Sequence, residues 1–308
     1  MEKIYDVLII GGGPAGLTTA IYTSRDRFST LLLEKGICGG LPATTDLIEN
    51  YPGFPEAING FALLSRFKEQ AVKFGSEIVE FEEVKDIERD EKLFIIHTPH
   101  DDYYAKTVVI AGGSLPKTLG IEGELELRGR GVSYCATCDG PLYIGKNVVV
   151  IGGGDSALQE ALFLTQFAQR VDLVYRRDKL RATRILQEKA KKNKKIFLHL
   201  NMVPQKINGE DKVNSVTFEN TKDNSKIDID CQGIFIYIGY IPNTGYLNSI
   251  VEYDDKGYIK TDEKMMTSCD GIFAVGDIRS KDVRQISVAV GEGTIAAITV
   301  REYLNNLE

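Results

Sequence analysis

The sequence predicts an α/β protein in which one three-layer unit occurs twice. Two observations support this prediction. A buried-strand pattern, a glycine-rich turn and the start of a helix follow one another at residues 7–17 and again at residues 147–157. A strand that ends in glycine and is followed by proline occurs at residues 108–116 and again at residues 233–242. Parallel strands connected through helices build Rossmann-like domains, so we expect two of them.

The order of the repeated patterns predicts how the two domains are connected. Residues 114–117 follow a buried strand and are expected to form a linker. The second domain then spans residues 117–243. The first domain is expected to comprise residues 1–116 and, after the chain returns, residues 244–308. The second domain is therefore inserted into the first.

Composition and charge exclude several classes of function. The chain has 308 residues, of which 43% are hydrophobic, and a net charge of -7, so it is long enough for about two globular domains. A nucleic acid or an anionic membrane as partner would require a basic surface, and neither is expected. No apolar stretch approaches the ~20 residues of a membrane span, and residues 1–6 lack the layout of a signal peptide. We expect a cytoplasmic protein.

The first glycine-rich turn has the features of a dinucleotide-binding loop. It comprises residues 11–16, Gly-Gly-Gly-Pro-Ala-Gly, between an apolar run and a helical pattern. Glycines let the backbone approach a pyrophosphate held at a helix N-terminus. The next strand, residues 30–33, ends at Glu34, whose carboxylate can accept hydrogen bonds from a ribose diol. A plain strand-to-helix turn with a surface glutamate is the alternative.

The second glycine-rich turn, residues 152–157, is followed by the opposite charge. Glu34 lies 18 residues after Gly16, whereas the position 18 residues after Ala157 is Tyr175, followed by Arg176, Arg177 and Arg181. A carboxylate suits a free ribose 2′-hydroxyl, and guanidinium groups suit a 2′-phosphate. The first site is therefore expected to hold FAD and the second NADPH, the alternative being an ordinary exposed arginine cluster.

Two cysteines three positions apart, Cys135 and Cys138, lie shortly before the second turn, and Asp139 follows them directly. Such a pair lowers the pKa of one thiol and places the second within reach to resolve a mixed disulfide. It predicts a redox-active dithiol. A static disulfide is the alternative, and the absence of a secretory context argues against it.

Half of a zinc site is another interpretation of two cysteines at this spacing. A structural zinc site needs four nitrogen or sulfur ligands. The other cysteines and the histidines are few and scattered; they are Cys38, Cys231, Cys269, His97, His100 and His199. We therefore expect no metal site, and we expect the three single cysteines to behave as small apolar residues.

Together these segments resemble the low-molecular-weight thioredoxin reductases, and the resemblance is collinear over nearly the whole chain. The motifs that carry it are Gly-Gly-Gly-Pro-Ala-Gly at residues 11–16, Glu-Asn-Tyr-Pro-Gly at 49–53, Cys-Ala-Thr-Cys-Asp at 135–139, Gly-Gly-Gly-Asp-Ser-Ala at 152–157, Arg-Arg-Asp-x-x-Arg at 176–181, Gly-Asp at 276–277 and Arg-Gln at 284–285.

The resemblance implies two cofactor sites. FAD is expected at Gly11, Gly13, Pro14, Ala15, Gly16, Glu34, Gly40, Leu41, Asn50, Ala111, Gly276, Asp277, Arg284, Gln285 and Ile286. NADPH is expected at Gly152, Gly154, Asp155, Ser156, Ala157, Arg176, Arg177, Arg181 and Gly239.

The resemblance also implies an activity, the reduction of the disulfide of a thioredoxin. Cys138 is expected to face the flavin, Cys135 to attack the external disulfide, and Asp139 to move protons as the acid. A turn residue is the alternative role for Asp139. Relatives of this kind are typically homodimers, so the same is expected here.

The sequence departs from the family at two positions. Leu41 stands where many relatives have Gln, which removes an amide near the expected flavin, and Tyr175 replaces the His often found before the arginine pair. Rival interpretations keep the flavin and the dithiol but use ferredoxin or NADH as donor, or a glutaredoxin-like or peroxiredoxin-linked protein as acceptor. A non-catalytic flavin redox sensor is a further alternative.

Overall fold

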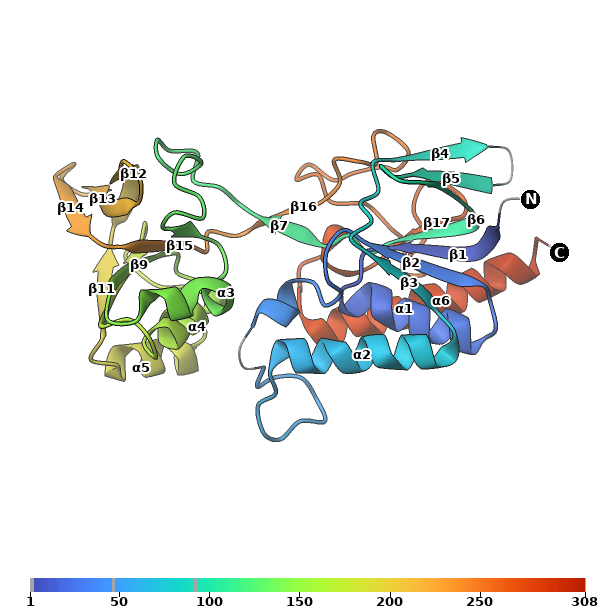
Figure 1. Ribbon diagram of the computed structural model, residues 1–308, viewed down its shortest axis with the longest axis horizontal. Coiled ribbons are helices and arrows are strands. Elements are labelled where there is room, and N and C mark those ends of the chain that lie inside the picture. The colour runs from blue at the N-terminus through green and yellow to red at the C-terminus, as the bar shows by residue number, and fades with distance from the viewer. Residues whose placement is uncertain (1–2, 46–47, 91–92, 308) are drawn as a thin grey trace. The chain divides into compact units, whose positions relative to one another are not determined.

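The computed structural model describes residues 3–45, 48–90 and 93–307, and its backbone divides into two compact units. Unit 1 comprises Met1–Leu115 and Ile241–Glu308, and unit 2 comprises Pro116–Tyr240. The second domain was expected at residues 117–243. Its expected start therefore lies one residue after the start of unit 2, and its expected end lies three residues after the end of unit 2. The first strand, β1 (Ile4–Ile10), and the last helix, α6 (Ile286–Asn305), blue and red in Figure 1, both belong to unit 1.

Unit 1 is built on a seven-stranded sheet (Figure 1). Strands β1, β2, β3, β6 and β17 pair in parallel, whereas β4 and β5 extend the sheet as antiparallel strands next to β6. The sheet order is β3 (Glu77–Glu80), β2 (Thr30–Glu34), β1 (Ile4–Ile10), β6 (Asp102–Ile110), β5 (Leu93–His97) and β4 (Asp86–Asp90), with β17 (Ile272–Ala274) on the other side of β6.

Each face of this sheet has its own core. Side chains alternate along a strand, so Val7 and Ile9 of β1 face one side, and Leu8 and Ile10 face the other. The first side is covered by the helices labelled together in Figure 1. They are α1 (Pro14–Arg25), α2 (Gly60–Phe74) and α6 (Ile286–Asn305), with the short turns η1 (Leu41–Thr44) and η3 (Gly276–Ile278) at their ends.

The helix ends of unit 1 follow from local sequence. Pro14 occupies the first turn of α1, where its missing N–H costs nothing. Asn59 caps α2 by accepting a hydrogen bond from the Ala62 N–H at 3.1 Å. Gly75 ends α2 with φ of 102°, a left-handed conformation that favours glycine.

Unit 2 repeats the α/β arrangement on a smaller scale. Its five-stranded parallel sheet has the order β11 (Ile196–Leu200), β10 (Arg170–Tyr175), β9 (Asn147–Ile151), β15 (Gly233–Ile236) and β8 (Val132–Ser133). One core joins this sheet to α4 (Asp155–Leu164) and α5 (Arg184–Lys192). A second core joins its other face to the antiparallel strands β12 (Met202–Gly209), β13 (Val213–Asn220) and β14 (Lys226–Asp230).

The predicted α/β fold with two parallel-sheet domains is therefore confirmed. The segments that connect the units contain two short paired strands, β7 (Ser114–Pro116) and β16 (Tyr240–Pro242). The linker expected at residues 114–117 thus includes a strand.

A carboxylate is buried in the sheet of unit 2. Asp172, on β10, is 1% exposed and accepts hydrogen bonds from Arg170 at 2.7 and 2.8 Å, and His199 Nε2 lies 2.7 Å from its Oδ1. Burial alone would raise the pKa of Asp172, but the bonds with His199 and Arg170 outweigh it and hold the pKa below its ordinary value. The ionised form of Asp172 therefore stabilises unit 2.

Replacing this carboxylate by an amide tests that stabilisation. Asp172→Asn is expected to lower the free energy of unfolding by ~2 kcal/mol at pH 7, because charge-assisted hydrogen bonds are lost. A folded-state pKa below the ordinary ~4 contributes stability that is fully present above that pH and is lost as the pH falls further. Urea denaturation followed by circular dichroism should show a smaller difference at pH 3 than at pH 7. The exposed Asp211→Asn is the control, and equal stability of Asp172→Asn and wild type at pH 7 would contradict the prediction.

Candidate active site

Two glycines of the turn between β1 and α1 are required by close backbone approach. Gly11 has φ of 109°, and a Cβ built on it would lie 2.4 Å from the Ala111 carbonyl oxygen. A Cβ on Gly16 would lie 1.9 Å from the Gly11 carbonyl oxygen. Any larger residue at these positions would push the turn away from the sheet.

Gly13 has a different reason to be glycine. Its backbone is ordinary extended chain, with φ of -77° and ψ of -175°, and a Cβ there would meet no atom within 4 Å. Gly13 precedes the first turn of α1, whose N-terminus has no side-chain cap among the described residues. An open space thus faces unpaired N–H groups, which is the arrangement that binds a phosphate.

Glu34 is tied to the same turn. Its Oε2 accepts a hydrogen bond from the Gly12 N–H at 2.7 Å, and its Oε1 accepts one from the Gly36 N–H at 3.0 Å. Each carboxylate oxygen has a further lone pair. Glu34 is therefore oriented by the backbone and can still accept hydrogen bonds from a ribose.

Two other expected FAD residues of unit 1 lie against this turn, and two more contact each other. A Cβ on Gly40 would lie 3.2 Å from Gly13 Cα, and a Cβ on Gly276 would lie 3.0 Å from Ala15 Cβ. Asn50 Nδ2 donates a hydrogen bond to Gln285 Oε1 at 3.1 Å. Leu41 begins η1, Pro14 begins α1 and Ile286 begins α6.

Two polar atoms in this region are buried without a hydrogen bond among the described residues, Asp277 Oδ1 and Arg284 Nε. Burial raises the pKa of Asp277, and the nearby Lys281 Nζ, 3.4 Å from Oδ1, works against that rise. The Arg284 guanidinium lies 4.3 Å from the centre of the Tyr258 ring. Asp277 Oδ1 is thus within ion-pair distance of Lys281. Buried polar groups normally have hydrogen-bond partners, so Arg284 Nε, which has none among the described residues, points to a polar ligand.

The segment that carries Asp277 is held by residues that the sequence analysis missed. Glu292, on α6 and 6% exposed, accepts a hydrogen bond from the Gly276 N–H at 2.7 Å. Its carboxylate also binds Arg279 Nη1 at 2.9 Å and Lys281 Nζ at 3.0 Å. The sequence did contain a sign of this role. Glu292 lies three residues after Ala289 and four before Ala296, so it is on the same, buried face of α6 as these alanines.

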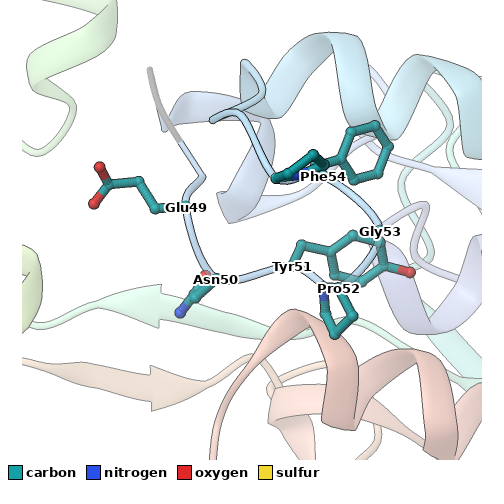
Figure 2. Close-up of a pocket in the computed structure, with 7 residues that line it drawn as sticks. Glu49, Asn50, Tyr51, Pro52, Gly53 and Phe54 are labelled. Carbon is teal, nitrogen blue, oxygen red and sulfur yellow. The ribbon is translucent and has the colours of Figure 1, made fainter.

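Residues 49–55, which include the motif Glu-Asn-Tyr-Pro-Gly, line an open hollow of about 450 Å³ (Figure 2). The backbone bridge between Ile48 and Ile58 closes this loop at its base. Figure 2 shows Tyr51 and Phe54 on one side of the loop and Glu49 pointing away from them. The ring centres of Tyr51 and Phe54 are 6.1 Å apart. The Tyr51 ring centre also lies 6.0 Å from the ring centre of Phe67 on α2, and this contact holds the loop that contains Asn50 against the helix.

Unit 2 has the same construction at residues 152–157. Gly152 has φ of 151°, and a Cβ on it would lie 2.3 Å from the Tyr237 carbonyl oxygen. Gly154 is extended, with φ of -97° and ψ of -178°, and a Cβ on it would meet nothing within 4 Å. Tyr175, the departure from the family, packs its ring against Gly153, where a Cβ would lie 2.5 Å from the ring. The ring of Tyr175 therefore supports the second turn and leaves no room for a side chain at residue 153.

The arginine segment folds back onto this turn. The N–H groups of Arg181 and Ala182 donate to the Gly153 carbonyl oxygen at 2.7 and 3.1 Å. The Thr183 N–H donates to Asp155 Oδ1 at 2.6 Å, so this acid is turned toward the same segment. The backbone of Arg181 is therefore held against the turn that precedes α4, and the side chains of Arg176, Arg177 and Arg181 are exposed.

The expected dithiol is a disulfide in the structure, with the Cα atoms of Cys135 and Cys138 5.3 Å apart. Cys135 is the extended residue that caps the short helix α3 (Ala136–Asp139), and its Sγ accepts a hydrogen bond from the Cys138 N–H at 3.2 Å. Ser133 Oγ accepts a hydrogen bond from the Cys135 N–H at 3.1 Å. Cys138 is exposed and Asp139 is partly buried.

The single cysteines differ from this pair. Cys38 and Cys231 are buried, and burial raises the pKa of each to about 12, so neither forms a thiolate near neutral pH. Cys269 is partly exposed. Within residues 3–45, 48–90 and 93–307, no three His, Cys, Asp or Glu side chains are grouped as metal ligands.

Comparison with known proteins agrees with this geometry. The family model for pyridine nucleotide-disulphide oxidoreductases matches residues 5–293. The thioredoxin reductase of Bacillus subtilis strain 168 is 46% identical over 308 residues, which are 100% of this chain and 97% of that protein. This chain belongs to the low-molecular-weight thioredoxin reductase family. The resemblance inferred from the motifs is thereby confirmed.

Solved structures of thioredoxin reductases share the fold. The enzyme from Lactococcus lactis superimposes with a TM-score of 0.95 at 44% identity, covering 98% of this chain and 99% of that one. The enzyme from T. acidophilum gives a TM-score of 0.94 at 37% identity and covers 100% of both chains.

The two kinds of loop glycine predict opposite effects of a methyl group. Gly152→Ala is expected to lower the free energy of unfolding by at least ~1 kcal/mol, because alanine is strained at this φ and its Cβ meets a carbonyl oxygen. Gly154→Ala is expected to change stability by less than ~0.5 kcal/mol, yet to weaken binding of a dinucleotide by filling the open space. Thermal denaturation and nucleotide titration of both variants measure this. Equal destabilisation by the two substitutions would contradict it.

Proposed function

We propose that this chain is a thioredoxin-disulfide reductase that uses FAD and NADPH. The observation that carries the proposal is the Cys135–Cys138 disulfide, held in the same unit as a dinucleotide loop whose next strand leads into arginines. Membership of the family supports the same conclusion. The proposal assigns unit 1 to FAD and unit 2, which carries the dithiol, to NADPH.

Unit 1 suits FAD on three counts. The turn at residues 11–16 offers open space at a helix N-terminus, Glu34 is oriented for a ribose, and Arg284 Nε is buried without a hydrogen bond from any described residue. In unit 2 the open space before α4 adjoins exposed arginines. Guanidinium groups there favour a nucleotide with a 2′-phosphate, and therefore NADPH over NADH.

The protein groups have defined tasks in this reaction. When bound, FAD supplies the capacity to take an electron pair from NADPH and deliver it to a disulfide. The Cys135 thiolate attacks the thioredoxin disulfide, which forms a mixed disulfide and releases one thioredoxin thiolate. Cys138 then attacks Cys135 Sγ, re-forms the internal disulfide and releases the second thiolate. The proposal assigns to Asp139, the residue after Cys138, the exchange of protons with these thiols.

We propose further that the protein acts as a cytoplasmic homodimer, in keeping with its family. Within the described part of the chain, no helix is both long and apolar enough to cross a bilayer. Sedimentation or light scattering of the purified protein measures the oligomeric state.

The cofactor assignment is tested by the absorbance spectrum of the purified protein under anaerobic conditions. We expect a yellow protein whose flavin absorbance is bleached by NADPH at lower concentrations than by NADH, and restored by oxidised thioredoxin. The Cys135→Ser and Cys138→Ser double variant should still be bleached by NADPH but should not reduce thioredoxin.

Three outcomes of this titration would favour a rival. Bleaching by ferredoxin or NADH alone would replace the donor. Restoration by a glutaredoxin-like or peroxiredoxin-linked protein alone would replace the acceptor. Bleaching without reduction of any disulfide would indicate a flavin redox sensor, and a colourless protein that takes up no FAD would refute the proposal.

The role of Asp139 is tested by removing its proton. Asp139→Asn is expected to lower turnover with thioredoxin by roughly 10²-fold, the usual contribution of a positioned acid or base, and to alter the pH profile of that turnover. Flavin bleaching by NADPH should be unaffected. Unchanged turnover at every pH would leave Asp139 as a turn residue.

A further inference from the structure

A tyrosine hydroxyl from a distant part of unit 2 takes part in the dithiol turn. Tyr237 Oη accepts a hydrogen bond from the Ala136 N–H at 2.8 Å, across 101 residues of sequence. Ala136 is the first residue of α3 and is 1% exposed. The first N–H groups of a helix have no partner within the helix. Tyr237 therefore supplies an acceptor that this buried donor would otherwise lack.

The position of Tyr237 is itself fixed by the sheet. Tyr237 directly follows β15, and its N–H donates to the Ile151 carbonyl oxygen at 2.8 Å. Its own carbonyl oxygen lies against Gly152, and its ring packs on the core shared with α4. Burial raises the pKa of Tyr237, so the hydroxyl stays neutral and accepts through a lone pair. The hydroxyl is thus a fixed point rather than a mobile surface group.

The other hydrogen bonds of the dithiol turn come from its own sequence neighbours. Ser133 Oγ accepts from the Cys135 N–H, and Cys135 Sγ accepts from the Cys138 N–H. These bonds shape the turn locally. The bond from Tyr237 joins the turn to the central strands β9 and β15.

We propose that Tyr237 is a positioning residue for the Cys135–Cys138 dithiol. Its hydroxyl keeps the turn in the disulfide-forming geometry after reduction and so raises the effective concentration of one thiol at the other. In the oxidised turn the S–S bond holds the Cα atoms 5.3 Å apart with or without this hydrogen bond. Loss of the hydroxyl therefore increases the conformational freedom of the reduced turn more than that of the oxidised turn. Because the two redox states are affected unequally, the equilibrium between dithiol and disulfide shifts.

The test is Tyr237→Phe in the FAD-loaded protein, equilibrated with glutathione buffers. One oxidised glutathione takes two electrons and two protons from the dithiol, which leaves the protein disulfide and two glutathione thiols. After thiol trapping, mass spectrometry of the peptide with Cys135 and Cys138 gives the fraction oxidised. The equilibrium constant is expected to move about fivefold toward the dithiol, which corresponds to ~20 mV for this two-electron couple.

Tyr143→Phe is the matched control. Tyr143 is also a buried tyrosine of unit 2, and its ring packs edge-on against Phe235, 5.3 Å between ring centres. Its hydroxyl takes no part in the hydrogen bonds described for the dithiol turn. The glutathione equilibrium of this variant should equal that of the wild type. A shift of the same size in both variants, or none in Tyr237→Phe, would overturn the proposal.

Amide hydrogen exchange gives a second readout. The Ala136 N–H should exchange about fivefold faster in reduced Tyr237→Phe than in the reduced wild type, because its acceptor is gone. Equal exchange rates would mean that the hydroxyl does not hold the reduced turn, and would overturn the proposal.

If Tyr237→Phe does not fold, the wild type alone tests the proposal. The Ala136 N–H should stay protected from exchange after the disulfide is reduced, because its acceptor, Tyr237 Oη, remains in place. Exchange of this N–H in the reduced wild type at the rate of an unprotected amide would overturn the proposal.

The inference rests on the proposed function, since the dithiol must cycle for its equilibrium to matter. The measurements with glutathione require neither NADPH nor thioredoxin. A protein that NADPH fails to bleach would contradict the proposed function and leave the role of Tyr237 measurable. An unchanged glutathione equilibrium in a competent reductase would contradict the role of Tyr237 alone.

Discussion

The close approach of a loop glycine to a backbone carbonyl is the constraint on which both units depend. In unit 1 Gly11 lies against the carbonyl of Ala111, and in unit 2 Gly152 lies against that of Tyr237. Each carbonyl belongs to the residue directly after the neighbouring parallel strand, β6 or β15. The contact therefore fixes where the next helix begins relative to the end of the neighbouring strand. It leaves the N-terminus of that helix open, and such a terminus can stabilise a phosphate group.

The parts that the sequence predicted well are those with a local physical cause. Residues 7–10 and 148–151 are apolar without alternation because parallel strands are covered on both faces, and both runs lie in buried strands. The glycine turns could be recognised because only glycine allows the approach described above. The spacing of Cys135 and Cys138 allowed a disulfide across one helical turn, and the structure has that disulfide.

The parts that could not be predicted depend on contacts between distant residues. The network of Glu292, Arg279 and Lys281 forms only when α6 is placed beside η3. Glu34 was expected to meet a ribose, but its bonds to the Gly12 and Gly36 N–H groups require the folded turn. Tyr175 was recognised from the sequence only as a replacement for a family histidine, whereas in the fold its ring packs against Gly153. No local pattern encodes these pairings, because each needs the sheet order first.

The discontinuity of unit 1 has a consequence for biosynthesis. Its strand β17 pairs with β6, and α6 approaches α1 so closely that a Cβ on Gly293 would lie 2.5 Å from the Ala15 carbonyl oxygen. Both late elements leave the ribosome after all of Pro116–Tyr240 has been made. Unit 2 can therefore fold during translation. The side of α1 that α6 covers stays exposed until translation ends. Chaperones that bind nascent chains would therefore have access to this exposed side of α1 before FAD can bind.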